Sequence, residues 1–225
     1  MQPLETLEIS TRNRVNASVI LMHGLGADGH DFASLAEELQ LPNLRFIFPH
    51  AAHRPVTING GYEMRAWYDL FGLQSDSPQD EAGIRQTQVQ IEALITREEQ
   101  RGIAAERIIL AGFSQGGAIA LHTAVRYPKR LAGVLALSTY LPLKILLENE
   151  THPANRRLLP IFMAHGTFDS IITLEIAKAS ADVLAQKGYP VDWHEYPMAH
   201  SVCAQELADM RRFICRVLTL DNGHD

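Results

Sequence analysis

A serine flanked by glycines marks the position in this chain that could supply a nucleophile. The segment Gly112-Phe113-Ser114-Gln115-Gly116-Gly117 follows a short apolar run and precedes a helical pattern. In a tight strand-to-helix turn, side chains at the two flanking glycines would collide with neighbouring backbone, and the serine would be strained with its Oγ exposed. This pattern is typical of a nucleophile elbow. The alternative from these residues alone is a helix start with Ser114 as its N-cap.

Two later residues supply the base and the acid that a serine nucleophile needs. The base takes the serine proton, and the acid orients the base. In α/β-hydrolases these residues follow the serine in the order Asp or Glu and then His, each after its own strand. Asp169 follows the apolar run 161–164, and His200 follows the last expected strand. Order and placement both fit, so we predict a triad of Ser114, Asp169 and His200.

The other histidines near these elements fit structural roles better. His194 lies inside the last expected strand, and His122 lies in the helix after the serine. His23 and His165 each precede a glycine at a strand end. These two could support the site, but a turn histidine with satisfied hydrogen bonds is the more frequent case. Asp192 lies in the same strand as His194 and cannot easily reach a loop at the far end of that strand.

Acyl transfer also needs backbone N–H groups aimed at the developing oxyanion. One donor is expected to be the N–H of Gln115, the residue after the nucleophile, whose side chain we interpret as structural. The loop His23-Gly24-Leu25-Gly26 follows the expected strand 18–22, and its glycines permit close backbone approach to a substrate. We therefore assign the second donor to the N–H of Leu25.

The same loop opens a competing motif. Residues 24–29 satisfy G-x-G-x-x-G between a strand and a helix, which is the dinucleotide-binding fingerprint. That fingerprint expects an acidic residue about 20 positions further on, for the ribose hydroxyls. The corresponding strand end, residues 46–50, reads Phe-Ile-Phe-Pro-His and has no acidic residue. Nucleotide binding is therefore the weaker interpretation.

The elements that must position these residues alternate between strand-like and helical patterns. The expected strands span residues 4–10, 18–22, 45–48, 107–112, 131–138, 160–165 and 191–196. The expected helices span 77–101, 117–127, 174–187 and 203–218, and Phe32, Leu35, Ala36 and Leu39 recur at helical spacing in another. This alternation predicts an α/β fold with a mainly parallel central sheet and helices on both faces. The connections 49–75 and 140–149 are placed where ligands meet such sheets.

Composition limits the class of protein. The chain has 225 residues, of which 46% are apolar and 20% charged, so we expect a single domain over residues 1–225 with a loose tail at 221–225. A net charge of −6 without any Lys/Arg block argues against nucleic-acid binding. No apolar run has the length of a membrane span or of a signal segment, so a cytoplasmic location without membrane insertion is expected.

The two cysteines are not expected to pair. Cys203 and Cys215 fall in the last expected helix, where twelve positions correspond to roughly 18 Å along the axis. A disulfide needs Cα atoms within about 7 Å. Two reduced thiols are therefore expected, and the sequence indicates no metal site.

Taken together, these segments resemble the phospholipase/carboxylesterase family of α/β-hydrolases, which includes the acyl-protein thioesterases. The resemblance extends over most of the chain through residues 21–29, 65–69, 112–118, 137–142, 165–169 and 196–202. It implies the α/β-hydrolase fold, the triad and the two oxyanion donors already named. It also implies that Trp67 and the Tyr140–Leu147 segment, with Leu141, border an apolar acyl pocket, although core packing explains both Trp67 and this segment as readily. In place of the family's usual Val-Val-Pro, Ile171-Ile172-Thr173 follows the aspartate.

These residues predict a serine hydrolase that cleaves carboxylic esters of short-to-medium acyl chains through an acyl-enzyme, without cofactor or metal. The chain is too short for a large lid domain, so an open and mostly apolar cleft is expected. Acyl-protein thioesterase and lysophospholipase activity are alternatives within the hydrolases, and a catalytically silent binding protein is the alternative outside them. The expected partner is a small ester or acyl thioester, including a lipidated protein. The natural substrate and the oligomeric state stay open.

Overall fold

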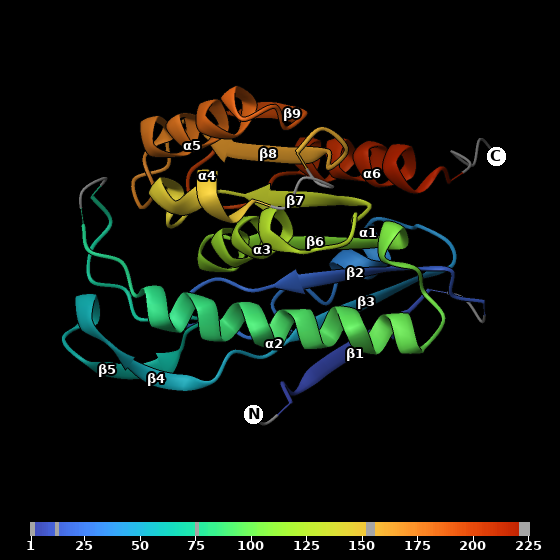
Figure 1. The fold of residues 1–225 in the computed structure, drawn as a ribbon, viewed down its shortest axis with the longest axis horizontal. Coiled ribbons are helices and arrows are strands. Elements are labelled where there is room, and N and C mark those ends of the chain that lie inside the picture. The colour runs from blue at the N-terminus through green and yellow to red at the C-terminus, as the bar shows by residue number, and fades with distance from the viewer. Residues whose placement is uncertain (1–2, 12–13, 75–76, 152–155, 221–225) are drawn as a thin grey trace.

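A central sheet organises the computed structural model, which describes residues 3–11, 14–74, 77–151 and 156–220 (Figure 1). Within these residues the sheet has seven strands in the order β1-β3-β2-β6-β7-β8-β9. Their bounds are β1 Thr6–Ser10, β2 Ala17–Met22, β3 Leu44–Pro49, β6 Ile108–Phe113, β7 Gly133–Leu137, β8 Ile161–Gly166 and β9 Val191–Tyr196. β1 runs antiparallel to β3, and all other neighbours are parallel. The predicted mainly parallel sheet is confirmed.

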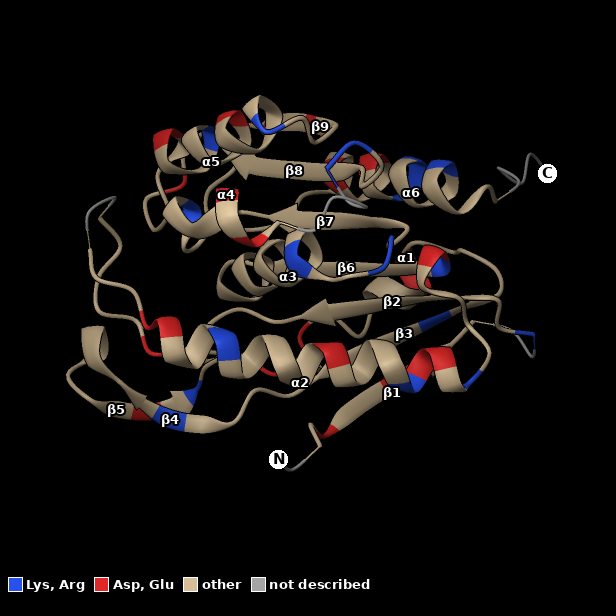
Figure 2. Ribbon diagram, viewed as in Figure 1, with Lys and Arg blue, Asp and Glu red and all other residues tan. Residues whose placement is uncertain are grey.

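Helices cover both faces of this sheet. Their bounds are α1 Leu35–Glu38, α2 Glu81–Gln100, α3 Gln115–Arg126, α4 Leu147–Glu150, α5 Leu174–Gln186 and α6 Ala204–Leu218. One apolar cluster joins α2, α3 and α5 to one face, and a second joins α1 and α6 to the other. Strands covered on both faces have few polar positions, and every residue of β2, β7 and β8 is buried. Charged residues of both signs are interspersed along α2 (Figure 2).

The bounds of all the expected helices differ from the observed ones, and α3 begins at Gln115 rather than at residue 117. α2 begins at Glu81 rather than at residue 77, because the Asp80 side chain accepts the Gly83 N–H at 2.9 Å and caps the helix there. The helix expected around Phe32 is shortened to α1, and the residues before it form turns. α6 begins at Ala204, so Cys203 is its N-cap and not an internal residue. Both cysteines are free, as predicted.

The long connection 49–75 contains a hairpin that was not expected. β4 His53–Val56 pairs antiparallel with β5 Tyr62–Arg65, and the short 3-10 helix Thr57–Asn59 lies between them. Two further 3-10 helices span Ala105–Arg107 and Lys144–Leu146. The tail expected at 221–225 lies outside the described residues. Among the described helices, none combines the length and the apolar character that a membrane crossing requires.

A buried carboxyl group at the start of α6 makes the stability of this fold sensitive to pH. Glu206 is fully buried in the first turn of α6, where burial raises the pKa of its carboxyl to about 8. The unfolded chain releases this proton near the ordinary glutamate pKa of 4.5, so between pH 4.5 and about pH 8 the folded protein holds a proton that the unfolded chain has lost.

We therefore predict that the contribution of Glu206 to the free energy of unfolding decreases as pH rises from about 4.5 to about 8, by an amount on the order of 4 kcal/mol. Buried histidines such as His122, whose pKa is lowered, act in the opposite direction and are common to both proteins. The Glu206→Gln substitution removes only the Glu206 titration, so the urea unfolding midpoint of the wild type, relative to that of the variant, should fall from pH 5 through pH 6 and 7 to pH 8. Glu38→Gln, an exposed carboxyl on α1, is the matched control and should keep the wild-type slope. An identical pH slope in the Glu206 variant would contradict the prediction.

Candidate active site

Ser114 occupies the turn between β6 and α3 in a conformation that side chains rarely adopt. Its backbone has φ 53° and ψ −120°, a strained region that costs on the order of 1–3 kcal/mol. The surrounding structure holds it there, because Ser114 donates its N–H to the Leu137 carbonyl at 2.9 Å. Thr139 Oγ1 donates in turn to the Ser114 carbonyl at 2.6 Å. Ser114 stands at the N-cap position of α3, but its hydroxyl makes no capping hydrogen bond, so capping does not account for the serine.

Close backbone contacts explain the glycines on either side of this serine. A Cβ added at Gly112 would lie 2.2 Å from the Gly116 carbonyl carbon. A Cβ added at Gly116 would lie 2.2 Å from the Met22 carbonyl oxygen on β2. Both distances are far below van der Waals contact, and the atoms involved are backbone. The turn can therefore form only with glycine at these two positions.

Asp169 and His200 meet at the ends of β8 and β9. His200 Nδ1 lies 2.6 Å from Asp169 Oδ2, and the aspartate side chain is fully buried. The other carboxylate oxygen accepts the N–H groups of Ile171 at 2.9 Å and Ile172 at 3.0 Å. Because the carboxylate takes the Nδ1–H of His200, the Nε2 atom of that ring is left as the proton acceptor. The ring of Phe113 packs against the imidazole at 4.7 Å between centroids.

A cavity of about 750 Å³ brings Ser114 and His200 together, and we call it the Ser114 cavity. Its other lining residues are Gly24, Leu25, Ala27, Asp31, Phe32, Ile58, Asn59, Tyr68, Leu70, Leu73, Phe113, Gln115, Tyr140, Ile171 and Ile172. Five of the predicted residues therefore line one cavity: Ser114, His200, Leu25, Gln115 and Tyr140. Asp169 does not line this cavity but contacts His200. The described residues form no large lid domain over it.

Leu25 and Gln115, the two residues expected to supply oxyanion donors, both line the Ser114 cavity. Within the described part of the chain, neither N–H has a hydrogen-bond acceptor. The loop that carries Leu25 is fixed next to it, because Gly26 donates its N–H to the Arg65 carbonyl of β5 at 2.9 Å. Unpaired N–H groups at a cavity that contains a serine can donate hydrogen bonds to a substrate oxygen.

Trp67 lines neither the Ser114 cavity nor the smaller apolar cavity beside it, which corrects the expectation that it borders an acyl pocket. Its side chain is 1% exposed, and its indole N–H donates to the His23 carbonyl at 2.8 Å. Its backbone N–H donates to Gln115 Oε1 at 2.9 Å, and Gln115 Nε2 donates to the Tyr68 carbonyl at 2.8 Å. The Gln115 side chain is thus structural, as predicted. Through Trp67 it connects the serine turn to the loop that carries Leu25.

The second cavity lies beside the first and has a volume of about 220 Å³. Five residues line both cavities: Tyr68, Leu70, Leu73, Tyr140 and Ile172. Leu141 lines only the second cavity, which continues along residues 77–79 and α5. The hydroxyl groups of Tyr68 and Tyr140 are 2.8 Å apart, so two residues that line both cavities form a hydrogen-bonded pair. Sequence reasoning missed Tyr68, Leu70 and Leu73, although their place in the long connection 49–75 is a signal for ligand contact.

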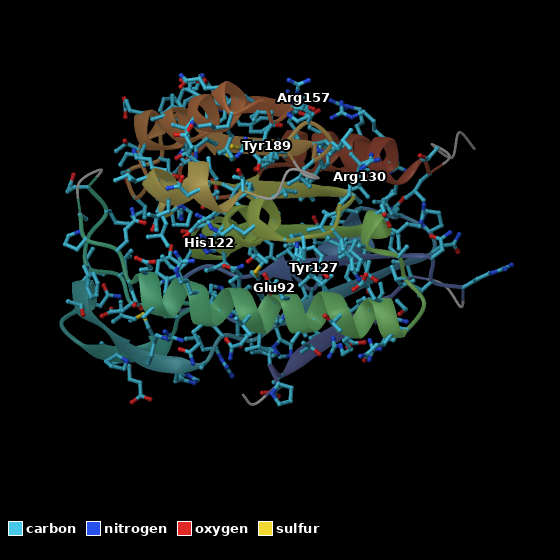
Figure 3. The ribbon with its side chains drawn as sticks, viewed as in Figure 1. Glu92, His122, Tyr127, Arg130, Arg157 and Tyr189 are labelled. Carbon is cyan, nitrogen blue, oxygen red and sulfur yellow. The ribbon has the colours of Figure 1, made fainter. Side chains whose placement is uncertain are left out.

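The other histidines have the structural contacts expected of them. His23 Nδ1 lies 2.7 Å from the Gly24 carbonyl, and its Nε2 accepts the Ala51 N–H at 3.0 Å. Burial lowers the pKa of His23, which keeps that ring neutral. His122 lies where α3 faces α2 (Figure 3), 2.9 Å from Gln88 Oε1, and burial lowers its pKa to about 3. His194 contacts Asp192 Oδ1 at 2.9 Å and stacks on Phe162.

One cluster among the described residues brings metal-ligating atoms within 4.8 Å of one another: Asp28, His30 and His50. Hydrogen bonds already occupy it. His50 Nδ1 accepts the Gly29 N–H at 3.1 Å, which leaves the proton of a neutral ring on Nε2. His30 Nδ1 lies 3.0 Å from Asp28 Oδ1. A metal ion would have to displace both interactions, so these residues do not form a ready cation site.

Comparison with known proteins shows the family to which the chain belongs. Residues 6–218 match the model of the phospholipase/carboxylesterase family. Acyl-protein thioesterase 1 of Neurospora crassa is 39% identical over 212 residues, covering 89% of this chain and 86% of the relative. The protein of the same name from Yarrowia lipolytica is 36% identical over 222 residues, covering 95% and 97%.

Solved structures show the same fold. Acyl-protein thioesterase 2 of Zea mays superposes with a TM-score of 0.87 at 27% identity, covering 95% of this chain and 99% of that one. Arabidopsis thaliana SOBER1 superposes with a TM-score of 0.85 at 29% identity, covering 90% and 99%. The chain therefore belongs to the phospholipase/carboxylesterase family, has the α/β-hydrolase fold, and is a hydrolase of the esterase and thioesterase type.

Proposed function

We propose that this protein hydrolyses acyl esters and thioesters through an acyl-enzyme formed on Ser114. The observation that carries the proposal is the 2.6 Å contact between His200 Nδ1 and Asp169 Oδ2, with His200 in the same cavity as the strained Ser114. An aspartate that holds one ring nitrogen of a histidine leaves the other as a general base. Ser114 is the nucleophile within that cavity whose proton this base can take.

The proposed reaction proceeds in two halves. In the first, His200 Nε2 takes the Ser114 proton while Oγ attacks the acyl carbonyl carbon, and Asp169 stabilises the imidazolium that forms. The leaving alcohol or thiol receives that proton from His200, and the acyl group stays on Ser114. In the second half, His200 removes a proton from water, the water oxygen attacks the acyl-enzyme, and the acid leaves. No cofactor or metal takes part in these steps.

The N–H groups of Leu25 and Gln115 would bind the carbonyl oxygen as it becomes negative. Each donor of this type is worth about 3–4 kcal/mol of transition-state stabilisation. The arrangement suits this use because the Gln115 side chain, Trp67 and the His23 carbonyl form one hydrogen-bonded connection between the two donor segments. A fixed spacing between donors avoids reorganisation at the moment of reaction.

We assign the acyl chain to the apolar side of the Ser114 cavity, with a preference for short to medium chains. The Tyr68–Tyr140 pair limits the depth of this cavity, and a longer chain would have to enter the second cavity past these rings. Ile171 and Ile172, which replace the valines usual in the family, line the same space. Because isoleucine is bulkier than valine, the side chains at these two positions leave less space for the acyl chain.

The leaving group distinguishes the remaining candidates. Relatives named acyl-protein thioesterases favour a thioester on a lipidated protein, whose bulk would stay outside the cavity. Lysophospholipase activity and a silent binding role are the other outcomes of a substrate test. We place the reaction in the cytoplasm, where two cysteines that form no disulfide are usual. A panel of p-nitrophenyl esters, acyl-CoAs, lysophospholipids and S-acylated peptides, compared by kcat/KM, separates these candidates.

Loss of the Ser114 hydroxyl should remove catalysis while keeping the fold. We predict that Ser114→Ala lowers kcat by about 10⁶-fold on p-nitrophenyl butyrate, as in other triads, with an unchanged unfolding midpoint. Ser34→Ala, at an exposed serine that makes no capping hydrogen bond, is the matched control and should keep wild-type kinetics. Retention of more than about a tenth of the activity by the Ser114 variant would contradict the triad, because its nucleophile is indispensable.

Removing the Tyr140 ring should change the preferred chain length. We predict that Tyr140→Ala joins the two cavities and raises the kcat/KM ratio of dodecanoate to butyrate esters by about tenfold or more, because each further buried CH₂ contributes about 0.8 kcal/mol. Tyr140→Phe keeps the ring and loses only the hydrogen bond to Tyr68, so its ratio should stay within about threefold of the wild type. Equal ratios in all three proteins would show that this pair does not limit the acyl chain.

A further inference from the structure

His165 is a buried histidine next to the predicted triad that the proposed reaction does not use. It lies in β8, four residues before Asp169, and it is fully buried. Its Nε2 lies 2.8 Å from the Ile172 carbonyl oxygen and 3.4 Å from Asp169 Oδ2. A carbonyl oxygen can only accept a hydrogen bond, so the proton of this ring is on Nε2.

The remaining surroundings of His165 favour a neutral ring. Burial lowers the pKa of its imidazole, and among the described residues its Nδ1 has no partner. Besides Asp169, the charged and titratable groups that face it are His200 and Glu195. The Trp193 ring of β9 stacks on it at 6.4 Å between centroids, and Lys178 Nζ of α5 lies over the Trp193 ring at 5.8 Å from its centroid. His165 is thus held as an Nε2–H donor.

The acceptor of this donor belongs to the turn that orients Asp169. Ile172 donates its N–H to Asp169 Oδ1 at 3.0 Å and receives the His165 Nε2–H at its carbonyl, so it is fixed on both sides. Ile171 donates to the same carboxylate oxygen at 2.9 Å. Asp169 Oδ2 is then directed at His200, 2.6 Å away. The orientation of Asp169 therefore depends on a turn whose far end is anchored to β8 by His165.

We propose that His165 is a positioning residue of the hydrolytic reaction: its Nε2–H holds the Ile172 carbonyl and thereby keeps Asp169 aligned with His200. This inference rests on the proposed triad and deepens it. The position of the donor, and not the ring itself, is what the alignment requires. A displaced Asp169 leaves substrate binding intact, but it orients His200 less well and stabilises the His200 imidazolium less in the transition state.

Substitution of His165 by glutamine or asparagine distinguishes the role of the N–H donor from that of the imidazole ring. The amide nitrogen of glutamine reaches the position of the imidazole Nε2, whereas that of asparagine reaches the position of Nδ1, which has no partner here. We predict that His165→Asn lowers kcat by about 10–100-fold with KM changed by less than about threefold, because small misplacements of catalytic groups have effects of this size. His165→Gln should keep kcat within about fivefold of the wild type.

Three controls accompany this pair. His194→Asn, in the neighbouring strand β9 and hydrogen-bonded to Asp192, should leave kcat unchanged. Circular dichroism and unfolding midpoints verify that each variant is folded. The low-field proton resonance of the His200 Nδ1–H, visible at low pH, should persist in His165→Gln and broaden or vanish in His165→Asn, an effect that general packing damage to a folded protein does not predict.

Wild-type activity of His165→Asn would overturn the inference, as would equal losses in folded Asn and Gln variants. Should the Asn variant not fold, nitrogen-15 NMR of the wild-type protein decides, because a proton on Nδ1 of His165 would overturn the assignment and one on Nε2 is required by it. Failure of the proposed triad looks different, since Ser114→Ala would then stay active. Failure of this inference alone leaves Ser114→Ala inactive and His165→Asn unimpaired.

Discussion

The contact between the serine turn and the neighbouring strand β2 constrains the whole site. Backbone atoms of Gly112, Gly116 and Met22 approach so closely that no Cβ fits at either glycine. Because the turn is that tight, Ser114 is held at a positive φ of 53° with its side chain directed at the cavity. The same tightness makes Gln115 the first residue of α3, where its backbone N–H has no partner within the helix. The proposed nucleophile and the proposed oxyanion donor are thus placed by the same steric constraint.

The other parts of the site are connected to this turn through hydrogen bonds between loops. The Gln115 side chain holds the backbone of Trp67 and Tyr68, and the Trp67 indole holds the His23 carbonyl before Leu25. On the opposite side, the loops after β8 and β9 are joined as well. Phe168 donates its N–H to the Met198 carbonyl at 3.0 Å, which connects the loop that carries Asp169 to the loop that carries His200. The candidate functional groups come from the ends of four strands, β2, β6, β8 and β9, and hydrogen bonds connect the loops that carry them.

The sequence predicted those parts that depend on local chemistry. The serine turn, the order of Asp169 and His200 and the alternation of strands and helices all leave a local pattern, and each is found where expected. The start of α2 was misplaced because apolar periodicity does not locate a cap, and Asp80 decides it. The β4–β5 hairpin was missed although Gly60 and Gly61 give a turn signal between its strands. Whether Trp67 faces a cavity or the core depends on tertiary packing, which no local pattern records.

Ser114, activated by His200, is the proposed nucleophile of this hydrolase. Covalent labelling of the folded protein with a fluorophosphonate probe, followed by mass spectrometry of tryptic peptides, tests this assignment. Cleavage after Arg107 and Arg126 releases residues 108–126, a peptide in which Ser114 is the one serine. If Ser114 is the activated nucleophile, a single adduct forms on this peptide, in the native protein and not in the heat-denatured protein. An active enzyme that shows no adduct there, or carries its adduct on another peptide, would contradict it.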